Sequence, residues 1–533
     1  MPAQVPLYSA KPIPARFGLP AALVMIVVLG VSGCGSLPEN SQRKHSMAIT
    51  GGEKTMLGLS LEGEKSAHPG KSGFVALGSG LDAFVARALL AHTAERSLDV
   101  QYYLYHSDLV GHLLTYKLLE AADRGVRVRV LLDDMDMGGR DATLAALDSH
   151  SNIEIRLFNP FNRGAPRGQQ LLTRFGDVTR RMHNKSFTAD NQATIVGGRN
   201  IGNEYFEADP DLAFGDLDVL AVGPVVSEVS GAFDKYWNNE LAYPVSSLVE
   251  KGAPIITIDE ARGYLGAYFE DQKDGDYLTA LRDSDLSARL RADDIQYSWG
   301  EAEALYDEPE KITQPPGSRE THLTPKLAPY IERLTDEFII LSAYFVPGKE
   351  GVEFLRQLAE RGVRVRLLTN SLASTDVAIV HAGYGKYRLD LLRAGVELYE
   401  VDKRVLKDQT RKGAGLTGSS RASLHAKAFI FDREELFIGS LNLDPRSTDQ
   451  NTEIGIAFHS PEMARKLARG FDENLADVAF RLELRTLNDG RETIRWIGTS
   501  QGEEVVFKTD PYTSFWKRFW VGLAGVLPIE SQL

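Results

Sequence analysis

The chain has 533 residues, which is too long for one ordinary hydrophobic core, so we expect two domains. Its apolar content of 43% and its charged content of 25% are typical of a folded globular body. A formal charge of -13 argues against non-specific nucleic-acid binding, which needs a surface that neutralises phosphates, so we expect no nucleic-acid partner. The single cysteine excludes intramolecular disulfides and cysteine-rich metal sites.

The N-terminal residues have the pattern of a targeting segment. Lys11 and Arg16 precede an apolar run over residues 19–31, which is shorter than the ~20 residues that span a bilayer. Small residues then lead to Cys34, so residues 1–34 are predicted to be a secretory signal peptide. This end resembles a bacterial lipoprotein signal, which implies that Cys34 is the lipidated first residue of the mature protein. The alternative is a signal anchor that contains Cys34 by chance.

The lipoprotein resemblance also implies a location. A lipid anchor would hold the protein in the bacterial cell envelope, exposed to the periplasm. Gly35 stands where an aspartate would retain a lipoprotein in the inner membrane, which favours the outer membrane. Residues 35–72 are polar and rich in Ser, Gly, Glu and Lys, so they are predicted to form a flexible tether.

Residues 73–245 alternate helical and strand patterns, as a layered α/β domain does. The spacing of apolar residues predicts helices over 82–94 and 110–122. β-Branched and aromatic residues predict strands over 98–104 and 125–132.

Residues 290–485 repeat the same order of elements. Helices are predicted over 323–334 and 351–359, and strands over 338–345 and 362–368. The order therefore predicts a second α/β domain of the same kind.

The two halves also share the sequence Arg-Gly-Val-Arg-Val-Arg, at 124–129 and at 361–366. This match, at nearly the same offset as the motif described next, indicates an internal duplication. The acidic, helix-like residues 246–289 are predicted to connect the domains, and residues 486–533 to form a C-terminal tail.

A motif of histidine, lysine, aspartate, a glycine-rich step and asparagine occurs once in each half. The first copy contains His183, Lys185, Asp190, Gly198 and Asn200, and the second contains His425, Lys427, Asp432, Ser440 and Asn442. Two matched copies in one chain predict a single composite site with two-fold pseudosymmetry.

The residue types in this motif suit a phosphoryl group. Residues two apart in a strand share a face, so His183 and Lys185 project together, as do His425 and Lys427. A neutral imidazole can attack or accept a proton near pH 7, and an ammonium group suits an anionic phosphate. The side-chain amides of the two asparagines can donate N–H groups to phosphate oxygens.

Other residues of the motif are expected to be structural. Asp190 and Asp432 each end an apolar strand before a turn, which predicts a role in the turn. Neither copy has further histidines or carboxylates at compact metal-ligand spacing, so no metal and no cofactor are expected. The acidic residues 133–136 could bind a cation, but their place after a strand favours a solvated loop.

These motifs resemble the phospholipase D superfamily, and within it the cardiolipin synthase branch, especially the bacterial C-type group. The resemblance covers residues 74–485. It rests on the doubled motif and on the segments Arg181–Phe187, Val196–Gly202, Tyr344–Pro347, Gly351–Asn370, His381–Tyr384, Phe437–Ser447 and Thr513–Arg518. It implies two pseudo-symmetric phospholipase D-type domains, each a mixed β-sheet flanked by helices, with the active site at their interface. The membrane-spanning N-terminus of the main cardiolipin synthases is absent here.

The resemblance also implies a mechanism. One histidine attacks phosphorus and forms a phosphohistidine, and the other protonates the leaving alcohol and then deprotonates the acceptor. We expect His183 to be the nucleophile and His425 the general acid and base. The lysines and asparagines hold the phosphoryl oxygens.

In the family each histidine is paired with a downstream carboxylate, and the matching positions are Asp216 and Glu453. Asp218 is the alternative to Asp216. We expect Asp216 to support His183 by fixing its tautomer.

The acceptor decides the reaction. The hydroxyl of phosphatidylglycerol gives cardiolipin, and water gives phospholipase D hydrolysis. The resemblance implies phosphatidylethanolamine, phosphatidylglycerol or both as phospholipid substrates. The alternatives are another phosphodiesterase or nuclease of the superfamily, and a lipoprotein that binds lipid without catalysis.

Residues 514–523 are predicted to form an amphipathic helix. Its apolar side chains fall on one side and are Phe515, Trp516, Phe519, Trp520 and Leu523. The helix either lies at a membrane surface or docks on its own domain. Four arginines before the first motif either attract anionic headgroups or are only solvated; they are Arg167, Arg174, Arg180 and Arg181.

Overall fold

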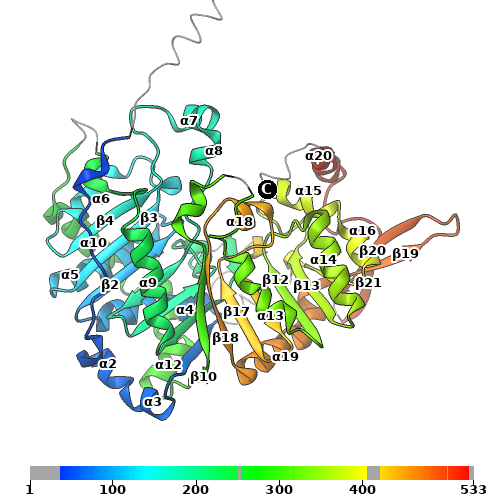
Figure 1. Ribbon diagram of the computed structural model, residues 1–533, viewed down its shortest axis with the longest axis horizontal. Helices are drawn as coiled ribbons and strands as arrows, with labels where there is room; N and C mark the ends of the chain where they lie inside the picture. Colours follow the sequence, from blue (N-terminus) through cyan, green and yellow to red (C-terminus); the bar gives the residue numbers. More distant parts are fainter. Residues whose placement is uncertain are drawn as a thin grey trace, which may run out of the picture.

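The computed structural model describes residues 37–209, 212–249, 254–315, 317–404, 421–500 and 502–526. Two large mixed β-sheets lie side by side, one in each half of the chain, with helices around them (Figure 1). The predicted signal peptide and Cys34 lie outside the described residues. Within the described ranges, no helix is both long enough and apolar enough to cross a membrane.

The first sheet combines three parallel strands with antiparallel neighbours. In spatial order its strands are β10 (Ser298–Gly300), β1 (Ser72–Leu77), β8 (Asp218–Val222), β6 (Ala193–Gly197), β5 (Ser186–Ala189), β2 (Ser97–Tyr102), β3 (Arg127–Asp133), β4 (Ile153–Phe158) and β9 (Ala242–Pro244). One face packs on a core shared with α4 (Gly80–Thr93), α5 (Leu109–Asp123), α6 (Asp141–Asp148), α10 (Ile258–Gln272), α11 (Asp276–Arg282) and α12 (Asp285–Arg291). The predicted helical connector thus forms part of the first domain's outer layer.

The second sheet has the same mixed arrangement. In spatial order its strands are β11 (Ala302–Tyr306), β18 (Ile454–His459), β17 (Glu435–Gly439), β16 (Lys427–Phe431), β12 (Glu337–Ser342), β13 (Arg364–Asn370), β14 (Glu397–Val401), β19 (Ala479–Thr486), β20 (Glu492–Ser500) and β21 (Glu503–Phe507). The helices that share its outer core are α13 (Ala328–Glu332), α14 (Gly348–Glu360) and α16 (Arg388–Arg393).

The predicted duplication is visible in the backbone. Helix α5 ends before Gly125 and leads into β3, and α14 ends before Gly362 and leads into β13. Gly125 and Gly362 have φ angles of 97° and 92°, which a residue with a Cβ rarely adopts. In each half the following strand pairs in parallel with its predecessor, β2 with β3 and β12 with β13.

A continuous apolar core joins the two domains. Strands β6 and β8 of the first sheet contact β17 and β18 of the second, and α9 (Val225–Trp237) and α19 (Pro461–Val478) contribute side chains to the same core. The rings of Phe74 and Phe458 stack across it with centroids 4.0 Å apart. A small third sheet also crosses the interface, with β7 (Leu212–Gly215) parallel to β15 (Arg421–Leu424).

Short helices gather at the edge where the parallel strands end, which is the upper edge in Figure 1. This edge carries η3 (Asp134–Asp136), α7 (Arg167–Thr173), α8 (Phe175–Val178), α15 (Ala378–Gly385), α18 (Pro445–Asp449) and α20 (Phe515–Val526). Other short 3-10 helices are η4 (Asn203–Tyr205), η5 (Val245–Ser247), η6 (Pro309–Ile312) and η7 (Thr324–Leu327).

The predicted flexible tether is wrong from about residue 40 onward. That stretch contains η1 (Asn40–Gln42), η2 (Gly52–Lys54), α2 (Met56–Ser60) and α3 (Glu62–Ala67). The Arg129 guanidinium donates to the Ser46 carbonyl over 3.0 Å, and the Ala48 N–H donates to the Asp234 carboxylate over 2.8 Å. Buried Leu61 also packs on the first core, but polar contacts hold much of this segment and it lacks a sustained apolar period, so hydrophobic periodicity does not reveal it.

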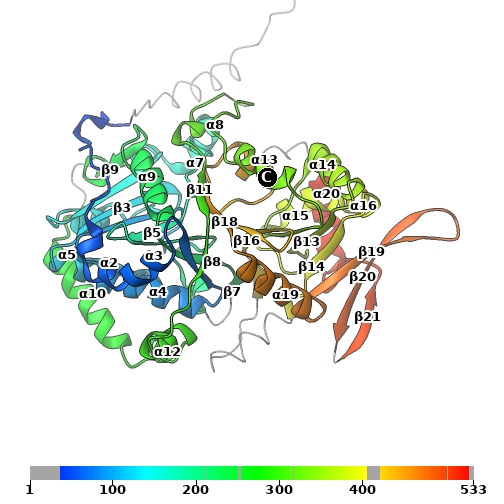
Figure 2. The ribbon, with the colours of Figure 1, turned by 60° about the horizontal axis from the view of Figure 1, so that its bottom comes forward.

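Two predicted boundaries also shift. Strand β10 belongs to the first sheet and β11 to the second, so the chain crosses between domains near Glu301 rather than near residue 290. Strands β19 to β21 extend the second sheet to Phe507, and Figure 2 shows them reaching beyond the body of the domain. Only the residues after that strand form the C-terminal tail.

The interdomain core predicts a large cost for truncating Phe458. We expect Phe458→Ala to lower the free energy of unfolding by about 3–5 kcal/mol, since it leaves a cavity opposite Phe74. Urea-induced unfolding measures the change. Leu487→Ala is the control, because Leu487 is 37% exposed and its loss should change stability by less than about 0.5 kcal/mol. Equal shifts for both variants would contradict the role given to this core.

Candidate active site

The histidine and lysine of each motif lie at the start of a central strand. His183 and Lys185 lead into β5, and His425 and Lys427 lead into β16. Both imidazoles are buried, with 8% of His183 and 5% of His425 exposed. The two copies of the motif therefore occupy equivalent positions in the two sheets.

The backbone at His183 pairs with the second domain. The His183 N–H donates to the Thr452 carbonyl over 2.9 Å, and the Thr452 N–H donates to the Arg181 carbonyl over 3.0 Å. This register brings the next residue, Glu453, beside the imidazole. His183 Nδ1 lies 2.8 Å from Glu453 Oε2.

The backbone at His425 makes the equivalent contact with the first domain. Strand β15, which ends at Leu424, pairs in parallel with β7, and the His425 N–H donates to the Gly215 carbonyl over 2.7 Å. The next residue of the first domain is Asp216. His425 Nδ1 lies 2.6 Å from Asp216 Oδ2.

The predicted pairing of Asp216 with His183 is therefore wrong, because each histidine is bonded to the carboxylate of the other domain. The pairing of strands between the domains determines which carboxylate meets which histidine. The spacing of residues along the chain does not show this pairing. Asp218, the alternative to Asp216, is held by buried arginines instead. Its carboxylate lies 2.8 Å from Arg87 and 3.4 Å from Arg199.

The glycine-rich steps support the two carboxylates from behind. A Cβ on Gly198 would lie 2.2 Å from Asp216 Oδ1, so only glycine fits there. The equivalent residue of the second copy, Ser440, has a side chain, and its hydroxyl donates to Glu453 Oε2. Each carboxylate is thus positioned by its own domain and directed at the histidine of the other.

The two lysines are buried beside the histidines. Lys185 Nζ donates to the His183 carbonyl over 2.6 Å, and Lys427 Nζ donates to the His425 carbonyl. Burial lowers the pKa of Lys185 well below its usual value and that of Lys427 to about 8. An anionic group that entered the site would stabilise the ammonium form of both lysines.

Burial and neighbouring charges lower the pKa of both histidines. Burial lowers the pKa of His183 well below its usual value, and the ammonium groups of Lys185 and Lys427 lower it further. Burial and Lys427 also lower the pKa of His425, although Asp216 opposes them. Lysines of both domains act on each histidine, so the two motifs form one site.

The two carboxylates differ from each other. Burial raises the pKa of Glu453 to about 7. Burial opposes ionisation of Asp216 as well, but His425 and Lys427 hold the pKa of Asp216 below its usual value. The two histidine–carboxylate pairs are therefore similar in geometry and unequal in charge.

The asparagines also differ. Asn200 Oδ1 accepts the Leu104 N–H over 3.2 Å, and its Nδ2 donates to the Tyr205 hydroxyl over 2.9 Å. Asn442 Oδ1 accepts the Tyr344 N–H over 3.4 Å. Among the described residues we find no acceptor for the Asn442 amide N–H, so this group is free for a ligand.

Asp190 and Asp432 lie in turns with φ angles of 52° and 50°. Each accepts three backbone N–H groups, from residues 95–97 and 335–337 respectively. Both aspartates thus fix the start of the neighbouring strand, which is the structural role expected from their place in the sequence.

Several residues of the site have no clear signal in the sequence. The Asp307 carboxylate accepts the Glu453 N–H over 2.7 Å and lies 3.0 Å from Lys311 Nζ, so it positions the backbone of Glu453. The Tyr103 ring meets the edge of His183 with centroids 5.0 Å apart. Phe214 stacks on His425 at 5.3 Å. They come from elements of both domains that only the fold brings together.

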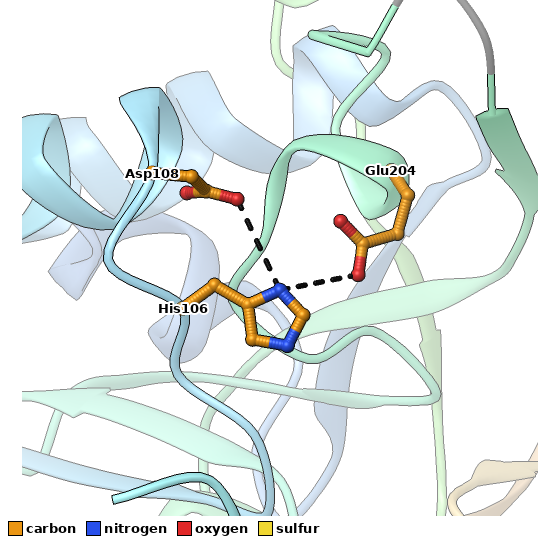
Figure 3. A group of neighbouring side chains, drawn as sticks. All are labelled: His106, Asp108 and Glu204. Carbon is orange, nitrogen blue, oxygen red and sulfur yellow. Dashed lines mark ion pairs between the residues drawn. The ribbon is translucent and has the colours of Figure 1, made fainter. Parts of the chain in front are cut away.

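One cluster outside the paired motifs has the donors of a cation site. His106 Nδ1 lies 3.3 Å from Glu204 Oε1 and 4.0 Å from Asp108 Oδ2 (Figure 3). The Asp108 oxygens already accept the backbone N–H groups of Gly111 and Asn203. Glu204 raises the pKa of His106, as expected for an ion pair that joins two loops.

The contact behind Asp216 predicts a sharp penalty for Gly198→Ala. The added Cβ overlaps the carboxylate, so we expect a loss of about 1–3 kcal/mol in the free energy of unfolding. The same change at Gly231, in α9, meets no atom within 4 Å and should raise stability by up to about 1 kcal/mol. Chemical denaturation of both variants measures the difference, and equal effects would contradict the contact.

Comparisons with known proteins identify the family of this chain. The family described as "Cardiolipin synthase, PLD-like domain" matches residues 88–237 and 327–475. Cardiolipin synthase C of Escherichia coli (strain K12) is 42% identical over 468 residues, which cover 88% of this chain and 98% of that protein. Cardiolipin synthase B of Salmonella typhi is 26% identical over 388 residues, 72% of this chain and 74% of that protein.

A solved structure shares the two-domain fold. Phosphatidylserine synthase of Haemophilus influenzae Rd KW20 aligns with a TM-score of 0.54 at 14% identity, over 86% of this chain and 95% of that one. The predicted family and fold class are confirmed. The chain belongs to the phospholipase D-like cardiolipin synthase family.

Proposed function

We propose that this protein synthesises cardiolipin by transferring a phosphatidyl group through a phosphohistidine. The observation that carries the proposal is the pair of buried histidines, each bonded to a carboxylate of the other domain, with a buried lysine beside each of them. The 42% identity to a cardiolipin synthase supports the same reaction.

His183 acts as the nucleophile in this proposal. Its Nδ1 is held by Glu453, which leaves Nε2 free to attack phosphorus. The Nε2–P bond forms as the bond from phosphorus to the oxygen of the leaving alcohol breaks, and His425 gives that oxygen a proton. In the second step His425 takes the proton of the acceptor hydroxyl, whose oxygen attacks phosphorus and releases His183.

The unequal charges of the two pairs support this order of roles. A nucleophile must be neutral, and burial with two ammonium groups keeps the pKa of His183 well below its usual value. A general acid must be protonated, and the ionised Asp216 favours the imidazolium of His425 by opposing the lowering of its pKa by burial and Lys427. Glu453, with a pKa of about 7, is the poorer partner for a second imidazolium.

The lysines and Asn442 stabilise the phosphoryl oxygens. Two buried ammonium groups suit the charge that develops on phosphorus oxygens in the transition state. The free amide of Asn442 adds a neutral donor. Asn200 has a different role, because its amide holds Tyr205 against His425, where the ring centroids lie 5.2 Å apart.

Lipid substrates fit this chemistry. Phosphatidylethanolamine or phosphatidylglycerol donates the phosphatidyl group and releases ethanolamine or glycerol, and the hydroxyl of a phosphatidylglycerol accepts it. Membrane association follows from such substrates, which do not dissolve in water. An acyl anchor at Cys34 would hold the protein in the cell envelope, on the periplasmic side and in the outer membrane.

The order of the two steps predicts a trapped intermediate. In His425→Ala the first step is slow, because the leaving oxygen must take its proton from water, and the acceptor hydroxyl of the second step has no base. We therefore expect a covalent phosphatidyl group to accumulate on His183 during a long incubation with labelled phosphatidylglycerol. Peptide mass spectrometry at mildly alkaline pH locates the label, since phosphohistidine is lost in acid. His183→Ala is the control and should carry none. Label confined to His425 in wild-type protein and absent from His183 would reverse the two roles.

The product pattern tests the reaction itself. Purified protein should convert labelled phosphatidylethanolamine to cardiolipin only when phosphatidylglycerol is present. Thin-layer chromatography measures the amount of labelled cardiolipin. Phosphatidic acid as the sole product would identify a hydrolase instead. Cleavage of single-stranded DNA would indicate a nuclease. If the protein turned over neither lipid nor DNA, and if His183→Ala bound lipid as well as the wild type does, the protein would be a lipoprotein without catalysis.

A further inference from the structure

Helix α20 presents an apolar face that the rest of the described chain does not cover. Five large side chains on it are between 48% and 65% exposed, and they are Phe515, Trp516, Phe519, Trp520 and Leu523. Folded proteins rarely leave so large an aromatic group open to water without a partner. The expected amphipathic helix is present, but its aromatic side faces away from its own domain.

The helix is fixed in place rather than loosely attached. Its opposite side packs on α15. The Ser514 hydroxyl accepts the Lys517 N–H over 3.1 Å and caps the first turn. Just before the helix, the Asp510 carboxylate accepts a hydrogen bond from Arg388 over 2.9 Å and lies 3.6 Å from His381, which anchors the segment to α15 and α16.

Its support is continuous with the catalytic site. The loop that leads into α15 contains Asp376, whose carboxylate accepts the Tyr344 hydroxyl over 2.7 Å. The same carboxylate acts on the charge of Lys427. Helix α15 and the loop before it therefore link the aromatic face to a residue of the catalytic site.

Other exposed groups lie along the same edge of the molecule (Figure 1). Leu172 on α7 is 85% exposed, and Ile379 on α15 is also exposed. Arg180 donates to the carbonyls of Ile312 and Gln314, and Arg446 to that of Thr179, with no carboxylate ion pair for either within the described ranges. Two guanidinium groups of this edge thus have no ion-pair partner in the described ranges, although the chain as a whole is acidic.

We propose that the aromatic face of α20, together with Leu172 and Ile379, docks on an anionic phospholipid bilayer and holds this edge of the molecule against it. This inference rests on the proposed function for its lipid substrate. Tryptophan and phenylalanine beside basic residues suit the boundary between headgroups and acyl chains. A second protein copy fits less well, because the proposed substrate lies in a membrane and the basic residues of this edge suit anionic headgroups.

Fluorescence of the two helix tryptophans tests the contact directly. The chain has five tryptophans, and Trp237 and Trp496 are buried. Vesicles of phosphatidylglycerol and phosphatidylcholine with brominated acyl chains should quench the emission of the full-length protein. The Trp516→Phe/Trp520→Phe variant keeps an apolar face, so it should still bind while losing most of the quenching.

Two outcomes of this measurement overturn the proposal. One is binding to the vesicles without quenching of the wild-type protein, which would mean that another segment makes the contact. The other is an absence of quenching together with a concentration-dependent dimer, measured by sedimentation, that Trp516→Ser/Trp520→Ser abolishes. That result would assign the face to a second copy.

Activity separates docking from chemistry. We expect Trp516→Ser/Trp520→Ser, and to a smaller extent Leu172→Ser, to lower the rate on vesicles by at least about tenfold, because each lost apolar contact weakens membrane affinity. The rate on monomeric short-chain lipid should stay within about twofold of wild type. Ile255→Ser, at a side chain 91% exposed on the outer layer of the first domain, is the matched control. Equal losses on both substrates would overturn the docking role, and a wild-type protein inactive on both would instead refute the proposed function.

Discussion

The site depends on hydrogen bonds that cross the domain interface. His183 is bonded to Glu453 and His425 to Asp216, and each contact follows from a short parallel backbone pairing between the domains. Neither domain alone contains a complete histidine–carboxylate pair. The apolar core shared by the two sheets is therefore part of the catalytic apparatus, because it fixes the register on which both pairs depend.

The same interface concentrates charge in a buried place. Lys185 and Lys427 lie beside the two histidines, and burial disfavours the ammonium form of both. A phosphodiester supplies the missing negative charge, so binding of the substrate and ionisation of the lysines stabilise each other. This coupling would let a protein of net charge -13 bind the phosphodiester of the proposed lipid substrate. The two histidine–carboxylate pairs also differ in the pKa of their carboxylates, which a perfectly symmetric site would not allow.

Much of this could be predicted from the sequence, because the duplication leaves two copies of each local pattern. The matched segments at 124–129 and 361–366 and the turns at Asp190 and Asp432 follow from local spacing, and the carboxylate positions 216 and 453 follow from the family resemblance. The partner of each carboxylate could not be predicted, since it is a property of the interface. The polar segment after residue 40 and Asp307 were missed for a related reason, because their contacts are long-range and lack an apolar period.

The crossed pairing is tested most directly by nitrogen NMR of the imidazole rings in full-length protein labelled with 15N-histidine. His183→Ala and His425→Ala assign the two Nδ1 resonances. We expect Asp216→Asn to shift the Nδ1 resonance of His425 strongly and that of His183 little, and Glu453→Gln to do the reverse. A strong shift of His183 in Asp216→Asn, with His425 unchanged, would place each histidine with the carboxylate of its own domain and contradict the crossed site.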